Sequence, residues 1–86
     1  MPPYDVVFAR SARKELQVLS HSLAERILKK IEALASNPRP PGCKKLRGHT
    51  GLWRMRVGDY RVIYSIDDKK GVVDVSVVRH RDEAYD

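Results

Sequence analysis

Hydrophobic and polar residues alternate most regularly in the second half of the chain. Residues 52–57 read L-W-R-M-R-V, so that large apolar side chains alternate with arginines. A period of two is typical of a β-strand with one buried face. Residues 60–66 and 72–78 are rich in β-branched and aromatic side chains, and turn-forming residues occupy 58–59 and 67–71. The pattern predicts a three-stranded antiparallel meander.

The first half of the chain has a helical period instead. Residues 12–19 and 23–36 each place apolar side chains three and four positions apart, which is typical of amphipathic helices. Ser11 is expected to cap the first helix. Ser22 and Glu25 have the spacing of a capping box at the start of the second helix. The short interruption between the two helices predicts a helical hairpin.

The predicted elements follow the order β-α-α-β-β-β, which indicates an α+β fold. A β-rich segment at 4–9 opens the chain, and a Pro-rich loop at 37–50 separates the helices from the meander. Because both helices need an apolar partner, the helical hairpin is expected to pack on one face of a mainly antiparallel four-stranded sheet. At this length, residues 1–86 are expected to form a single domain.

Strand pairing determines where the arginines of the meander lie. A two-residue turn at 58–59 places Arg56 opposite Arg61 and Arg54 opposite Ile63. The large apolar side chains are expected to face the helices, so the arginines belong to the open face. Opposed like charges destabilise a strand pair, and a phosphate between two planar guanidinium groups relieves the repulsion. A plain solvated face is the alternative interpretation.

Composition adds a strong positive charge to this picture. Lys and Arg number 17 against 11 Asp and Glu, giving a formal net charge of +6 at pH 7. Such an excess suggests a polyanionic partner, although basic residues also serve solubility alone. The long loop after the helices contributes Lys44, Lys45 and Arg47, and the C-terminal segment contributes Arg79 and Arg81. This distribution favours contact with an RNA backbone.

The C-terminal segment also contains groups that can exchange protons. Histidine is the side chain that most readily exchanges a proton near neutral pH, which makes His80 a candidate, and Tyr85 can act as a base where cations stabilise its phenolate. Cleavage of RNA by its own 2′-hydroxyl needs a base, an acid and cations for the charge that develops on phosphorus. The arginines, His80 and Tyr85 together can supply all three, so no metal or other cofactor is expected. Simpler interpretations remain for both residues: His80 as a surface histidine, and Tyr85 as an apolar cap on the sheet edge.

The N-terminal residues do not resemble a signal peptide, because they lack a basic start followed by an apolar core. No apolar run approaches the length of a membrane span. A cytoplasmic protein without membrane contact is therefore expected.

Several segments of the predicted strands, helices and C-terminal region resemble those of the RelE/ParE superfamily of toxins from toxin–antitoxin modules. The resemblance covers almost the whole length and includes Y-D-V-V-F, A-R-K-E-L, K-K-L-R-G-H, W-R-M-R-V-G-D-Y-R-V-I-Y and H-R-D-E-A-Y. It implies a ribosome-dependent endoribonuclease, an mRNA interferase, that cuts mRNA in the ribosomal A site. It also implies a cognate antitoxin that wraps the toxin and could form a hetero-oligomer with it.

The resemblance to RelE-like members implies roles for individual residues. Arg56 and Arg61 would bind the scissile phosphate, with Arg54 beside them on the adjoining backbone. A basic residue after the last strand would stabilise the transition state, and this is Arg81 or Arg79. Tyr85 would act as the base. The best-known members have lysines at the positions of Arg54 and Arg56, and since arginine does not release its proton, these two are expected to stabilise charge.

The remaining candidate residues complete the expected site. His80 is the candidate acid, and Lys44, Lys45 and Arg47 are expected to bind RNA. The ParE branch shares the fold but inhibits DNA gyrase without a nuclease site, and the presence of Arg61 and Tyr85 favours the RelE branch. A non-catalytic basic RNA-binding module is the third alternative.

Overall fold

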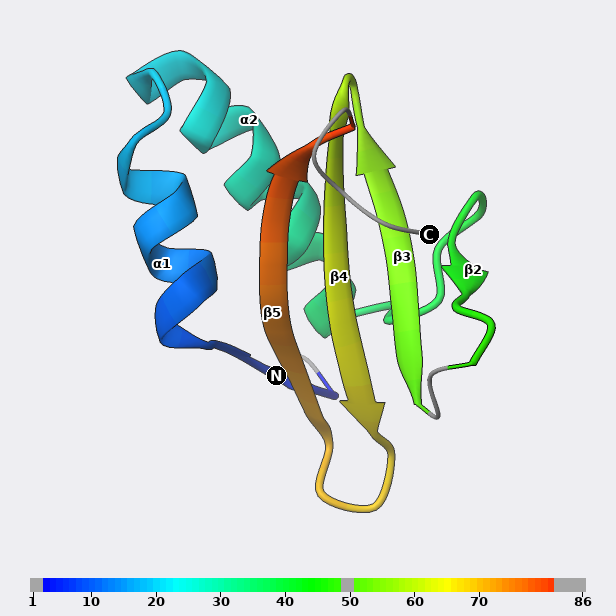
Figure 1. Cartoon of the computed structure of the whole chain (residues 1–86). Coiled ribbons are helices and arrows are strands. Elements are labelled where there is room, and N and C mark those ends of the chain that lie inside the picture. The colour runs from blue at the N-terminus through cyan, green and yellow to red at the C-terminus, as the bar shows by residue number, and fades with distance from the viewer. Residues whose placement is uncertain (1–2, 49–50, 82–86) are drawn as a thin grey trace.

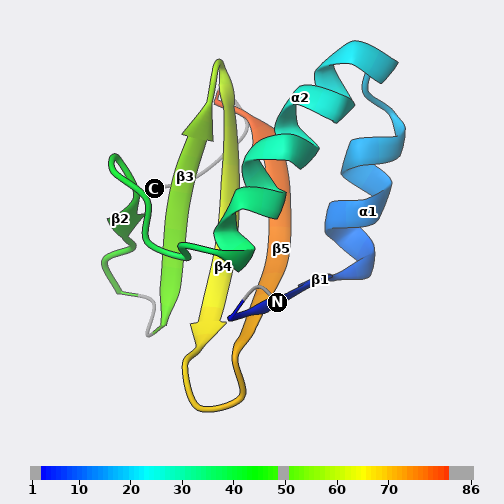
Figure 2. The same cartoon turned by 180° about the vertical axis from the view of Figure 1, so that it is seen from behind.

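The computed structural model describes residues 3–48 and 51–81. Two helices cover one face of a mixed sheet and leave the other face open (Figures 1 and 2). The elements in chain order are β1 (Asp5–Phe8), α1 (Arg10–Gln17), α2 (His21–Glu32), the 3-10 turn η1 (Ala33–Ala35), β2 (Lys44–Lys45), β3 (Leu52–Val57), β4 (Tyr60–Asp67) and β5 (Val72–His80). The α+β class and the helical hairpin are thus confirmed.

The sheet has five strands in the order β1-β5-β4-β3-β2, where four were predicted. The fifth is β2, which lies inside the predicted loop and pairs antiparallel with β3. Two residues are too few to produce a recognisable alternation, so the sequence pattern missed this strand. Strand β1 pairs with β5 in parallel, whereas β3, β4 and β5 form the predicted antiparallel meander.

Both predicted helix caps are wrong. Helix α2 begins two residues earlier than expected, and the hydroxyl of Ser20 accepts a hydrogen bond from the amide of Leu23 at 3.4 Å, so Ser22 lies inside the helix. Ser11 lies inside α1, and its hydroxyl donates to the carbonyl of Ser76 at 2.8 Å. A tertiary partner has therefore taken the hydroxyl that was expected to cap the helix.

The hydrophobic core lies between the helices and the sheet. It is built from apolar side chains of α1, α2 and η1 on one side and of β3, β4 and β5 on the other: Ala12, Ile27, Ile31, Leu34, Met55, Val57, Val62, Tyr64, Val73, Val75 and Val78. Trp53 packs against the same cluster, which confirms that the apolar residues of β3 face the helices. None of the described helices is long and apolar enough to span a membrane.

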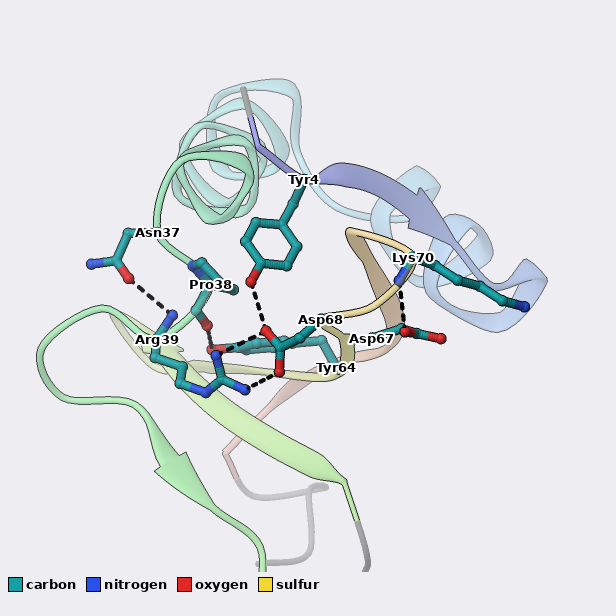
Figure 3. A network of polar contacts seen from close by, with 8 residues as sticks. All are labelled: Tyr4, Asn37, Pro38, Arg39, Tyr64, Asp67, Asp68 and Lys70. Atoms are coloured by element: carbon teal, nitrogen blue, oxygen red, sulfur yellow. Dashed lines mark hydrogen bonds and ion pairs between the residues drawn. The ribbon is translucent and has the colours of Figure 1, made fainter. Parts of the chain in front are cut away.

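A polar network holds the Pro-rich loop against the sheet (Figure 3). Arg39 makes two hydrogen bonds to the carboxylate of Asp68, at 3.3 and 2.9 Å, and lies over the Trp53 ring at 5.2 Å. Tyr4 donates its hydroxyl to the same carboxylate at 2.6 Å. Beneath them, Tyr64 donates to the carbonyl of Pro38 at 2.8 Å. These contacts tie the loop that precedes β2 to the start of β1 and to the β4–β5 turn.

The carboxylate of Asp68 should make this network pH-dependent. Hydrogen bonds from Arg39 and Tyr4 hold the pKa of Asp68 below its usual value. A depressed pKa contributes stability above the unfolded value of about 4, and that contribution disappears as the pH falls through the folded pKa. Asp68→Asn should therefore lower the free energy of unfolding at pH 7, and the difference from wild type should become smaller in acid. Urea unfolding at pH 7 and pH 3 measures both values.

Asp74→Asn is the matched control, because Asp74 is an exposed aspartate on β5 and the substitution changes the charge equally. It should not reproduce the pH-dependent difference. An Asp68→Asn effect of equal size at both pH values would contradict the electrostatic role of the network.

Candidate active site

Three arginines lie in one row across the sheet. Arg56 on β3 pairs with Arg61 on β4, and Arg61 pairs with Arg79 on β5. The first pairing is the one predicted from the two-residue turn, and it is confirmed. Because paired residues share a face and neighbouring strands are about 4.8 Å apart, the three side chains begin close together on the face opposite the helices. We call this set, Arg56, Arg61 and Arg79, the arginine row.

A β-bulge places Arg79 in the arginine row. The register between β4 and β5 shifts between Ile63 and Tyr64, where Ser76 becomes an extra residue on β5. Its hydroxyl donates to the carbonyl of Ile63 at 3.2 Å. Without this insertion Val78 would lie opposite Arg61. Counting from the β4–β5 turn does not reveal a bulge, so the sequence left the choice between residues 79 and 81 open.

A second basic group adjoins the arginine row. Lys44 on β2 pairs with Arg54 on β3, which in turn pairs with Ile63 as predicted. Arg54 is only 7% exposed, although it lies on the face that was expected to be open. It lines a pocket of about 240 Å³ together with Lys44, Lys45, Leu46 and Arg47. Among the described residues, the charged side chains that line this pocket are cations, and such side chains attract anions.

His80 lies on the other face of the sheet. It pairs with Tyr60, and the two rings meet edge to face with their centroids 5.4 Å apart. Tyr60 packs against the core, and both residues line a pocket together with Leu23 of α2. Alternation along β5 turns His80 towards the helices, where it also lines a pocket of about 200 Å³ together with Glu15 and Arg79.

The remaining candidates lie at or beyond the end of β5. Arg81 is exposed, and its backbone amide donates to the carbonyl of Asp59 at 2.7 Å. Tyr85 lies outside the described residues. Within residues 3–48 and 51–81, no group of three or more His, Cys, Asp or Glu side chains is arranged to hold a metal ion.

An ion pair links the arginine row to the helical layer. The side-chain Nε of Arg79 donates to Glu15 of α1 at 2.6 Å. The other carboxylate oxygen of Glu15 accepts the backbone amide of Val78 at 2.9 Å. Sequence patterning gave no indication of this contact, because the two residues are 64 positions apart.

Known toxins share this fold over nearly its whole length. The structure of the archaeal RelE–RelB complex from Pyrococcus horikoshii OT3 superimposes with a TM-score of 0.82 at 34% identity, covering 98% of this chain and 100% of that one. The isolated RelE toxin of Escherichia coli gives a TM-score of 0.77 at 30% identity, covering 90% of this chain and 83% of that one.

Sequence comparison gives the same relationship. The toxin RelE of Mycobacterium tuberculosis is 35% identical over 85 residues, which are 96% of this chain and 87% of that protein. The mRNA interferase toxin RelE of Escherichia coli K12 is 34% identical over 86 residues, which are 95% and 90% of the two chains. The family model described as the ParE toxin of the type II toxin–antitoxin system, parDE, matches residues 6–85. The chain therefore belongs to the ParE toxin family of type II toxin–antitoxin systems, and it is a homologue of the RelE toxins.

Proposed function

We propose that this toxin is a ribosome-dependent endoribonuclease that cuts mRNA in the ribosomal A site. The observation that carries the proposal is the arginine row, in which three cations begin side by side on adjacent strands. Opposed like charges destabilise the free sheet, and the phosphate of a bound RNA offsets this cost. The homology to a protein named mRNA interferase toxin RelE supports the same activity.

In the proposed reaction the 2′-oxygen of the RNA attacks the adjacent phosphorus, and the bond from phosphorus to the 5′-oxygen breaks. The products are a 2′,3′-cyclic phosphate and a 5′-hydroxyl. Arg56 and Arg61 bind the non-bridging oxygens and stabilise the charge that develops on them. Arg79 takes the third cationic role, in preference to Arg81, because the register aligns it with Arg61.

Proton transfer is assigned separately, because arginine remains protonated at physiological pH. Tyr85 is the proposed base that removes the proton of the 2′-hydroxyl. The leaving 5′-oxygen is proposed to take its proton from solvent, since His80 faces the helices next to Tyr60. Arg81 is proposed to contact the neighbouring RNA backbone.

The basic pocket beside the arginine row extends the proposed RNA track. Lys44, Lys45, Arg47 and Arg54 would hold the phosphates that flank the cleaved one. A cognate antitoxin is the expected partner of a type II toxin, and the similar proteins of Pyrococcus horikoshii and Mycobacterium tuberculosis form RelE–RelB and RelBE2 complexes with theirs. The ribosome and its mRNA are the proposed targets.

Inhibition of DNA gyrase is the second candidate function, because the matching family model is described as a ParE toxin. Primer extension on translated mRNA after expression of the toxin separates the two. Cuts at defined codon positions support the endoribonuclease. DNA-damage signalling without mRNA cuts supports gyrase inhibition, and RNA binding without toxicity indicates a non-catalytic basic module.

Arg61→Ala and Tyr85→Phe should each reduce cleavage by at least about 100-fold, because one loses a cation at the scissile phosphate and the other loses the base. Growth arrest and primer extension measure the loss, and circular dichroism checks folding. Arg13→Ala removes an exposed arginine from α1 and should keep full toxicity. Full toxicity of both Arg61→Ala and Tyr85→Phe would refute the assignment.

Arg56→Gln should stabilise the free protein while it weakens cleavage. Removal of the charge opposite Arg61 is expected to raise the free energy of unfolding by about 0.2–1 kcal/mol in dilute buffer. The gain should shrink in 1 M salt, where charges are screened over about 3 Å. Urea titrations at both salt concentrations measure it, with Arg13→Gln as the control for net charge. A destabilised Arg56→Gln at low salt would show that the opposed pair carries no electrostatic cost.

A further inference from the structure

Glu15 contacts two consecutive residues of β5 at the end of the arginine row. One carboxylate oxygen accepts the backbone amide of Val78 at 2.9 Å, and the other accepts Nε of Arg79 at 2.6 Å. The side chain of Glu15 is 21% exposed and that of Arg79 is 43% exposed. The carboxylate is thus the more enclosed partner, and it is anchored to the backbone independently of the guanidinium.

The topology explains why a helix residue reaches this position. Strand β1 pairs with β5 only along residues 72–75, and in the described part of the chain α1 lies beside the rest of that edge (Figure 1). Ser11 and Glu15 are one helical turn apart, and they bond to the carbonyl of Ser76 and the amide of Val78. Side chains of α1 therefore satisfy the backbone groups that a neighbouring strand would otherwise pair.

This arrangement determines the environment of Arg79. Arg61 lies opposite it on β4 and carries the same charge, and an arginine side chain loses rotamer entropy when it binds. Glu15 offsets the repulsion from the side away from β4 and restrains the Nε edge of the guanidinium. Such restraint before the substrate arrives lowers the cost of reaching the productive geometry.

We propose that Glu15 is a positioning residue, which holds the guanidinium of Arg79 at the end of the arginine row for contact with the RNA phosphate. The inference rests on the proposed endoribonuclease function and adds a residue from the helical layer to it. Glu15 does not touch the RNA itself. Its effect on cleavage acts through Arg79, and this dependence is what an experiment can measure.

The test is a double-mutant cycle of Glu15→Gln and Arg79→Ala in a cleavage assay on ribosomes programmed with mRNA. Glutamine keeps an oxygen for the amide of Val78 but presents an amide donor to Nε of Arg79, so the restraint on the guanidinium is lost. Glu15→Gln alone should reduce kcat about 10-fold, since small misplacements of catalytic groups are costly. In the Arg79→Ala background the same substitution should change kcat by less than about 2-fold.

Glu25→Gln on α2 is the matched control. Glu25 is also a helical carboxylate beside a basic side chain, 3.7 Å from His21, and its substitution changes the net charge equally. It should leave kcat unchanged within about 2-fold, because Glu25 is expected to be independent of the arginine row. Thermal unfolding of every variant separates a loss of kcat from a loss of folded protein.

Each outcome bears on the proposal in a definite way. Wild-type cleavage by Glu15→Gln overturns it, as does an equal loss of kcat in the presence and absence of the Arg79 side chain. Either result leaves the endoribonuclease function intact. Wild-type cleavage by Arg79→Ala removes Arg79 from the proposed reaction and overturns the positioning role with it. Absence of cleavage by the wild-type toxin overturns the proposed function itself.

Discussion

The cross-strand register that brings three arginines into one row is the constraint on which the proposed site depends. The row consists of Arg56, Arg61 and Arg79, whose Cα atoms are cross-strand partners. This register fixes the three Cα atoms next to one another. The apolar side chains of the other face hold this register, because they are buried under the two helices. A slip of one residue in the register would turn the apolar side chains of β3 to the open face, so the core holds the arginines where they are.

The rest of the molecule limits or exploits this concentration of charge. Glu15 provides a carboxylate at one end of the row, and it is itself anchored to the backbone of Val78. At the other side, β2 adds Lys44 next to the largely buried Arg54. The loop before β2 is held by the ion pair between Arg39 and Asp68. Positive charge is thus distributed along a track across the sheet.

Much of this site was predictable from sequence because a two-residue turn specifies its register. Alternation in 52–57 and the turn at 58–59 suffice to place Arg56 opposite Arg61. The position of Arg79 depends on the bulge at Ser76, and no local pattern marks a bulge of this kind. The same bulge turns His80 towards Tyr60, on the side of the sheet that the helices cover, and its role as an acid stays a prediction.

Other features could not be predicted for a different reason, because they depend on tertiary contacts between residues far apart in the sequence. The two-residue strand β2 exists only through its pairing with β3, and the hydroxyl of Ser11 bonds across to Ser76 instead of capping its helix. The contact between Glu15 and Arg79 joins elements at opposite ends of the chain. Tyr85, which the resemblance to RelE-like toxins implicates, lies beyond the described residues and stays a prediction.

The salt dependence of binding to a short single-stranded RNA tests most directly whether the arginine row is a phosphate site. Each phosphate contact contributes about 0.7 to the slope of log affinity against log salt concentration. Replacement of Arg56, Arg61 and Arg79 by glutamine should therefore reduce the magnitude of the slope by about 2 relative to wild type. An unchanged slope in this triple variant would contradict the account, because it would mean that the RNA backbone binds elsewhere on the protein.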